Sequence, residues 1–284
     1  MLVELHCHSN LSKREIVVVE GLNTPKEILE HAKKLGLGAV AITDHDVITG
    51  SLQAKKLEKK YGVVVIIGQE VTTKSGHVLA LGISEFIRPK MTVEETIDII
   101  HDQDGIAIAP HPFDLYKEGI KEKAALCDAI EGFNSLNLDR ISNRKSYRFG
   151  KMRNMIMVAG SDAHCIEMMN HGVISVKAHD MDSVLKEIKR GKVIIEKADY
   201  HSAKVIKDWS ARRLKLSYDQ VLAYINENYS WPKRVVSRNL LALVNMYPGR
   251  IDYFFRALTY ASLGATMMYS ATREVTNRIA QTVY

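Results

Sequence analysis

Short apolar runs rich in β-branched residues alternate with amphipathic stretches from the first residue to about residue 196, and this pattern constrains the fold most. Such alternation is typical of repeated strand–helix units that build a parallel sheet. Its many repeats favour a closed or nearly closed α/β barrel over a doubly wound sheet, and no G-x-G-x-x-G sequence follows the first run. We expect strands at 2–5, 38–43, 63–67, 77–83, 106–109, 129–133, 155–160, 173–176 and 192–195.

Two of the stretches between these runs carry strong helix-start signals. Thr24 and Glu27 have the spacing of a capping box, in which each side chain binds the backbone N–H of the other residue. Thr92 and Glu95 repeat this spacing. We expect helices over 24–36 and 92–102.

After Asp199 the sequence loses its strand alternation. The segments that follow are helical in pattern and are interrupted at Trp231-Pro232 and Pro248-Gly249. We expect two domains, an α/β barrel over residues 1–198 and an all-helical module over residues 199–284. The helices predicted in the module are 202–215, 217–228, 233–246, 250–263 and 265–282.

The positive charge of the chain belongs to this helical module. The formal net charge is +6, and residues 201–284 contain twelve Lys and Arg against five Asp and Glu. Sixteen uncharged residues at 257–272 fall short of the roughly 20 needed to cross a bilayer. We therefore expect a buried bundle helix there, and no membrane span.

Cysteine usage and the first residues indicate the cellular compartment. Cys7, Cys127 and Cys165 form no C-x-x-C pair, so neither a disulfide framework nor a thiolate zinc site is expected, and free cysteine is usually a small buried hydrophobe. The first ten residues show neither a basic n-region nor an apolar h-region, so we expect no secretory signal and a cytoplasmic protein.

Histidines follow the first apolar run. Strand side chains alternate between two faces, so His6 and His8 point the same way and Cys7 points the opposite way. We expect Glu4, on the face of the two histidines, to accept an N–H hydrogen bond from an imidazole. Two imidazoles with a supporting acid are typical of a metal site.

Other apolar runs also end at a histidine or an acid. In a parallel barrel the C-terminal ends of the strands form one rim, so residues far apart in the sequence converge there. His77 differs, because it precedes its run and lies at the wrong end unless the connection after Glu70 is short. The residues that this pattern brings to the rim are His45, Glu70, His111, Asp162 and His164.

These residues lie in motifs that resemble those of the polymerase and histidinol phosphatase (PHP) family. The motifs occur in family order over roughly residues 1–196, and their combination is specific although each one is short. They are HCHS (6–9), TDH (43–45), GQE (68–70), GHVLALG (76–82), HP (111–112), IEGFN (130–134) and GSDAH (160–164).

The resemblance implies a distorted (β/α)7 TIM-like barrel that holds up to three metal ions on nine ligands. Glu20, in VEGLNTP (19–25), is the candidate for the ninth ligand, after an apparent insertion behind the first motif. Histidine and carboxylate ligands suit Zn, Mn or Fe, so we expect two or three divalent ions as cofactors. The ligands carried over are His6, His8, Glu20, His45, Glu70, His77, His111, Asp162 and His164.

The same resemblance implies a metal-dependent hydrolase of phosphate esters. Bound ions activate water for in-line attack on phosphorus, so no serine or cysteine nucleophile is required. Among the ligands we expect His111 and Asp162 to act in catalysis. Substrate phosphate also needs cations from the protein, and Arg140 and Arg144 are spaced to share one helix face. Weaker candidates for phosphate contacts are Asn134 and Asn143.

Three functions remain open. The first is a phosphoesterase (phosphatase) for a small phosphorylated compound or nucleotide. The second is a nuclease for phosphorylated nucleic-acid ends, with the basic module holding the nucleic-acid backbone. The third is a non-catalytic scaffold barrel in an RNA–protein assembly, although such a descendant is expected to have lost metal ligands.

Overall fold

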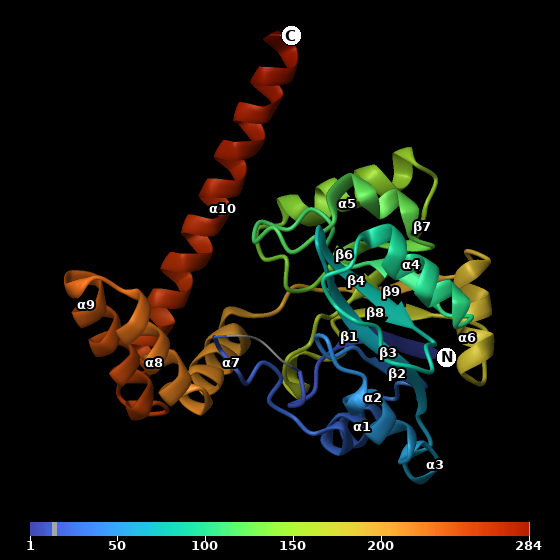
Figure 1. The fold of residues 1–284 in the computed structure, drawn as a ribbon, viewed down its shortest axis with the longest axis horizontal. Helices are drawn as coiled ribbons and strands as arrows, with labels where there is room; N and C mark the ends of the chain where they lie inside the picture. The colour runs from blue at the N-terminus through green and yellow to red at the C-terminus, as the bar shows by residue number, and fades with distance from the viewer. Residues whose placement is uncertain (13–15, 284) are drawn as a thin grey trace.

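Nine strands form one mixed sheet in the computed structural model, which describes residues 1–12 and 16–283. The strand order is β7-β6-β5-β4-β3-β2-β1-β8-β9, with helices on the outside (Figure 1). Each predicted strand is present. The strands are β1 (Leu2–Cys7), β2 (Ala39–Ile42), β3 (Val64–Thr73), β4 (Gly76–Leu81), β5 (Ile106–Ala109), β6 (Ala129–Asn134), β7 (Ile156–Gly160), β8 (Gly172–Ser175) and β9 (Ile194–Ala198).

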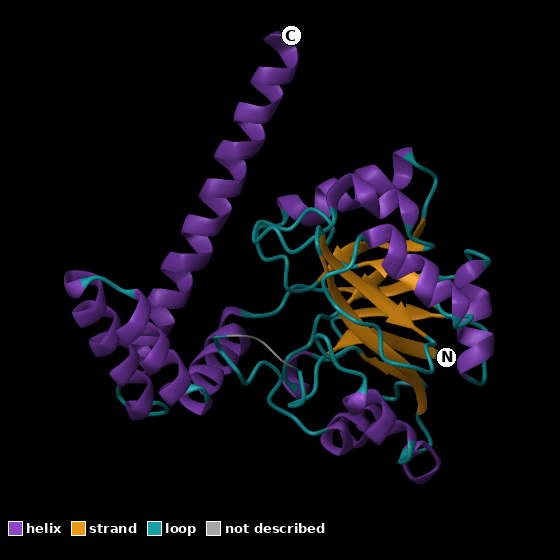
Figure 2. Cartoon of the chain, viewed as in Figure 1, coloured by secondary structure: helices purple, strands orange, loops and turns teal. Residues whose placement is uncertain are grey.

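The sheet curls into a nearly closed barrel. Ala163, after the end of β7, forms a parallel bridge with Cys7 at the end of β1, and β7 also contacts β8. Strands β1 to β7 therefore enclose the barrel, as in a distorted (β/α)7 TIM-like fold, while β8 and β9 extend the sheet beyond β1. Figure 2 shows the strands gathered in this one curved layer.

The sheet is not parallel throughout, which corrects the expectation drawn from the apolar runs. β3 and β4 are antiparallel because only Lys74 and Ser75 join them, and parallel strands need a long crossover. β4 is also antiparallel to β5, as β8 is to β1 and to β9. His77 pairs with Thr72, so the start of β4 lies at the end of the barrel where the parallel strands finish.

The predicted capping boxes are confirmed. The Thr24 hydroxyl accepts a hydrogen bond from the Glu27 N–H, and the Glu27 carboxylate accepts one from the Thr24 N–H. Thr92 and Glu95 do the same. The helices of this part are α1 (Pro25–Lys34), α2 (Thr49–Lys55), α3 (Glu58–Tyr61), α4 (Val93–Asp102), α5 (Ile141–Met152) and α6 (Met181–Lys189), with 3₁₀ turns at Lys121–Leu126 and Ile166–Met168.

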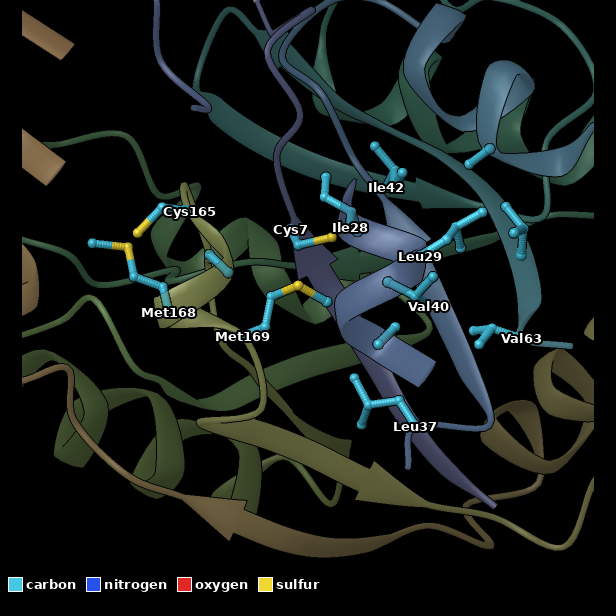
Figure 3. Packing of buried hydrophobic residues seen from close by; sticks show 14 of the residues in the cluster. Cys7, Ile28, Leu29, Leu37, Val40, Ile42, Val63, Cys165, Met168 and Met169 are labelled. Carbon is cyan, nitrogen blue, oxygen red and sulfur yellow. The ribbon is translucent and has the colours of Figure 1, made fainter. Parts of the chain in front are cut away.

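Apolar side chains fill both faces of the sheet. Between the sheet and α1, Cys7 packs in a cluster with Leu29 and Val40 (Figure 3). Cys165 belongs to the same cluster, so both cysteines are buried hydrophobes, as expected. A second cluster fills the barrel interior around Leu5, and burial of this kind contributes about 25 cal/mol per Å² of apolar surface. The barrel is therefore a packed core with its polar residues at one end.

The described residues after β9 form helices that lie beside the barrel (Figure 1). The segments predicted at 250–263 and 265–282 are one continuous helix, because a single residue such as Gly264 costs a helix only about 1 kcal/mol. The helices are α7 (Ala203–Leu216), α8 (Tyr218–Asn228), α9 (Trp231–Ala242), a 3₁₀ turn at Leu243–Met246 and α10 (Asp252–Val283).

Helix α10 is not the buried bundle helix that the sequence predicts. Leu258, Tyr260 and Met268 are exposed, and the helix runs past its neighbours as a single rod (Figure 1). The uncharged run therefore reflects an exposed face and not a core. None of the described helices combines the length and apolar character that a bilayer crossing demands. The domain boundary between residues 198 and 199 stays a prediction.

Candidate metal centre

Eight side chains meet at the end of the barrel where the parallel strands finish. They come from β1, β3 and β4 and from the segments after β1, β2, β5 and β7, so strand ends position them as the sequence predicts. All eight are buried. They are His6, His8, His45, Glu70, His77, His111, Asp162 and His164.

Glu70 lies at the centre of this cluster. Its Oε1 atom is 2.9 Å from His77 Nδ1 and 3.1 Å from His111 Nε2. His77 reaches this position because β4 runs antiparallel to β3. A residue at the start of β4 therefore lies at the same end of the barrel as the residues that follow the parallel strands. A carboxylate with imidazoles around both oxygens has the arrangement of a bridge between two metal ions. Three further nitrogens lie 3.3 Å from Oε2, namely His6 Nε2, His8 Nε2 and His45 Nδ1.

Asp162 is a second carboxylate surrounded by imidazoles of the cluster. Its Oδ1 atom is 3.4 Å from both His6 Nε2 and His8 Nε2, and 3.6 Å from His164 Nδ1. The Asn134 amide donates to Oδ2 at 3.2 Å and so fixes the orientation of the carboxylate. Asp162 and Glu70 therefore lie on either side of the two histidines of the first motif.

Ligand atoms from the cluster fall into four overlapping groups, in each of which the atoms lie within 4.8 Å of one another. That spacing suits one ion in each of two or three neighbouring positions. The groups are His8, His45 and His164; His6, His8 and Glu70; His6, His111 and Asp162; and His45, Glu70 and His77.

Glu20 lies at the edge of the cluster, where the sequence predicts a ninth ligand. Its Oε1 atom is 3.4 Å from His164 Nε2, and its side chain is buried. The Leu22 N–H, two residues after Glu20, donates to the His164 carbonyl at 2.9 Å, which ties the Glu20 segment to the segment after β7. Glu20 therefore lies at the rim beside the other proposed ligands.

Buried imidazole nitrogens without hydrogen-bond partners show that the cluster fits metal ions. His164 Nδ1 donates to the Asp162 carbonyl at 2.9 Å, while its buried Nε2 atom has no hydrogen bond. His8 Nε2 and His111 Nδ1 are buried without one as well. Such atoms are costly unless something binds them. Nitrogen and carboxylate donors are the ligands that Zn, Mn and Fe accept.

The pKa values describe a site built from anions and imidazoles. Burial raises the pKa of Glu70, but the charges of His45, His77 and His6 outweigh burial and hold that pKa well below its usual value. Burial, together with the charge of the neighbouring His164, lowers the pKa of His8 to about 4, so His8 is neutral at physiological pH. The ionised Glu70 and the neutral His8 are therefore in the forms that bind metals.

Two members of the cluster have backbones in the left-handed region. The φ angle is +29° at His111 and +50° at Asp162, which is unusual for residues other than glycine. The Glu131 carboxylate accepts a hydrogen bond from the His111 N–H at 2.9 Å and so helps to hold the first of these conformations. Strain of this kind, about 1–3 kcal/mol per residue, concentrates at functional sites.

Glu131 is the residue that the sequence analysis missed. The His6 Nδ1–H donates to its Oε1 atom at 2.9 Å, so Glu131, and not Glu4, is the acid behind the first histidine. A register shift between Glu4 and Cys7 breaks the strict alternation of β1, and Glu4 instead accepts from the Ser161 hydroxyl at 2.6 Å. The sequence offered one sign of this role, because Glu131 is the only acid within the apolar run 129–133.

Arg140 and Arg144 both lie at the surface, at the start of α5. The Arg140 guanidinium lies 5.1 Å from the centre of the Tyr200 ring. Neither arginine forms an ion pair with the cluster within residues 1–12 and 16–283. Their role in binding phosphate stays a prediction. Asn143 binds the backbone N–H of Asn134 and so supports the Asp162 side of the cluster.

Comparisons with known proteins agree with this geometry. A family model described as PHP domain matches residues 4–282. An uncharacterized protein of Methanocaldococcus jannaschii is 38% identical over 149 residues, which cover 50% of this chain and 87% of that protein. A solved two-domain protein of Bacteroides vulgatus, described as containing a predicted PHP-like metal-dependent phosphoesterase, has a TM-score of 0.57 at 16% identity over 74% of this chain and 69% of its own. At that identity the likeness shows the fold.

Two relatives with named activities match a shorter segment. A phosphoribosyl 1,2-cyclic phosphate 1,2-diphosphodiesterase of Eggerthella lenta is 33% identical over 91 residues, which are 30% of this chain and 32% of that enzyme. A 5′-3′ exoribonuclease of Haemophilus influenzae is 32% identical over 93 residues, 31% of each chain. These matches span about a third of each enzyme, too little to carry the activity of either one over to this chain.

Proposed function

Because this chain belongs to the PHP domain family, we propose that it hydrolyses a phosphate ester of a small compound or nucleotide with the help of two or three divalent metal ions. One observation carries the proposal. The buried Glu70 carboxylate has imidazole nitrogens within 3.3 Å of both of its oxygens, and this arrangement serves metal binding better than it serves stability.

The residues that hold the ions are His6, His8, His45, Glu70, His77, His111, Asp162 and His164, with Glu20 completing the third position. Ions at such a site supply Lewis acidity, which polarises phosphate oxygens and acidifies a water nucleophile. We propose Zn, Mn or Fe, because the donor set is nitrogen and carboxylate oxygen.

The protein itself orients these groups. Glu131 accepts the His6 Nδ1–H, so His6 Nε2 faces Glu70 and Asp162, where it can bind an ion, and Asn134 fixes the Asp162 carboxylate. We assign His111 and Asp162 to the catalytic step, because they share one group of donors with His6 and because both have strained backbones, which concentrate at functional sites. Arg140 and Arg144 remain candidate contacts for more distant parts of a substrate.

A nuclease is the second candidate. The surplus of positive charge in residues 201–284 favours binding of a phosphate backbone, and one relative is a 5′-3′ exoribonuclease. The nitrogen and carboxylate cluster serves either substrate, so the cluster does not separate the two candidates. The small substrate comes first because the basic residues are spread over several helices.

Hydrolysis assays on the metal-loaded protein test the proposal. A generic phosphomonoester, nucleotides and a 5′-phosphorylated oligonucleotide are compared for wild type, His8→Ala and Asp162→Ala. We expect both variants to lose at least about 100-fold of the activity, the size of loss typical when transition-state charge stabilisation is removed. Full activity in Asp162→Ala contradicts the proposal. Activity on the oligonucleotide alone, falling steeply with added salt, favours the nuclease.

A further inference from the structure

Helix α7 forms one wall of the metal centre. The Trp209 indole N–H donates to the Glu20 carbonyl at 3.0 Å, and the Trp209 ring lies 4.8 Å from the His164 ring. The Ser217 hydroxyl, at the end of the same helix, accepts from the Val19 N–H at 3.0 Å. Figure 1 shows α7 as the helix of its group that is nearest to the barrel. The helical module therefore contacts the proposed ligands directly.

Arg213 extends from this helix toward the cluster. Its guanidinium lies 4.4 Å from the centre of the Trp209 ring, a cation–π contact that fixes its direction, and 3.6 Å from Glu20 Oε1. Its side chain is 24% exposed, so a ligand can reach it. Within the described part of the chain, Arg213 is the one lysine or arginine that forms an ion pair with a proposed ligand.

The charge at this edge changes when ions bind. Two or three divalent ions bring more positive charge than Glu20, Glu70 and Asp162 neutralise. An ion at the Glu20 position also draws on the carboxylate that now faces Arg213. A guanidinium and metal ions on the same side of a site together attract an anion, and a planar guanidinium matches a phosphate group through two parallel hydrogen bonds.

We propose that Arg213 binds the phosphate group of the substrate at the Glu20 edge of the centre, and that Trp209 is the residue that positions it. This inference rests on the proposed function and adds a contact from the helical module to it. Arg213 has a direct link to the ligand set, whereas Arg140 lies over Tyr200. The helical module thus contributes to substrate binding through α7, whatever the remaining helices do.

The test uses the full-length, metal-loaded protein with Arg213→Gln and Arg213→Lys. Arg212→Gln is the matched control, because Arg212 directly precedes Arg213 on α7 and its guanidinium lies 3.7 Å from the Glu167 carboxylate at the surface. Three quantities are measured: the Kd of inorganic phosphate by calorimetry, the metal content, and kcat and KM for a generic phosphomonoester. We expect Arg213→Gln to raise Kd and KM about 10- to 100-fold with metal content unchanged. The Kd and KM of Arg213→Lys are expected to lie between those of wild type and Arg213→Gln. Those of Arg212→Gln are expected to equal the wild-type values.

Other results of these measurements distinguish failure of the phosphate-binding role of Arg213 from failure of the proposed function. Phosphate binding in Arg213→Gln equal to that of wild type overturns the inference, and the proposed function stands if hydrolysis continues. Loss of metal from Arg213→Gln also overturns it, because Arg213 then acts by holding Glu20. If wild type binds phosphate and hydrolyses no ester, while Arg213→Gln binds phosphate weakly, the binding site stands and the proposed function fails.

Discussion

Glu131 shapes the site without being a proposed ligand. One of its carboxylate oxygens accepts from His6 Nδ1 and the other accepts from the His111 N–H and the Asn134 amide. In Glu131→Gln one of these oxygens becomes an N–H₂ donor, so at least one bond is lost. We predict a 10- to 100-fold rise in the metal Kd, roughly the cost of losing a residue that orients a ligand, measured by competition with a chelator.

The exposed Glu122→Gln is the control for this variant, since it removes the same charge from the surface. Its metal Kd is expected to equal that of wild type. If Glu131→Gln also binds metal like wild type, then the tautomer of His6 does not depend on Glu131, and the orientation argument fails.

Single residues were predicted unevenly from the sequence. Strand ends placed His45, His111 and Asp162 correctly, because strand direction alone decides which end of a barrel a residue occupies. The partner of His6 was predicted to be Glu4 but is Glu131. The prediction failed because a register shift inside β1 leaves no signal in residue types. Such shifts depend on the pairing of neighbouring strands, which a local pattern does not contain.

At the scale of elements, the capping box of α1 makes a separate prediction. Thr24→Ala removes the hydroxyl that accepts from the Glu27 N–H, which is expected to lower the free energy of unfolding by about 1 kcal/mol. Denaturant unfolding measures this loss, and metal content is expected to stay constant. Lys26→Ala, which breaks only an exposed ion pair with Glu30, serves as the control with almost no effect. An equal loss in both variants contradicts the capping argument.

Elements were predictable where local rules decide them and less so where tertiary structure does. Every predicted strand forms, because runs rich in β-branched residues favour strands. The directions of β4, β8 and β9 were missed, since an apolar run looks the same whichever way it enters the sheet. The exposed face of α10 was missed as well, because hydrophobicity in a helix does not reveal whether another element covers it.

At the scale of the whole molecule, the barrel and the helical module share the site. The barrel supplies eight proposed ligands from its strand ends, and α7 of the module holds Glu20 through Trp209 and faces it with Arg213. The contact between the two parts was outside the reach of sequence reasoning, because residues 20 and 209 are linked only by folding. The whole chain is therefore the unit on which metal binding and hydrolysis have to be measured.

Anomalous X-ray diffraction at the metal absorption edges, on crystals of the purified protein, decides whether Glu70 is the centre of a metal site. We expect two or three divalent ions per chain, with both oxygens of Glu70 bound to ions and His77 among the ligands. A third ion is expected beside Glu20 and His164. Fewer than one ion per chain under metal-replete conditions, or ions bound away from Glu70, means that the cluster is not the metal centre proposed above.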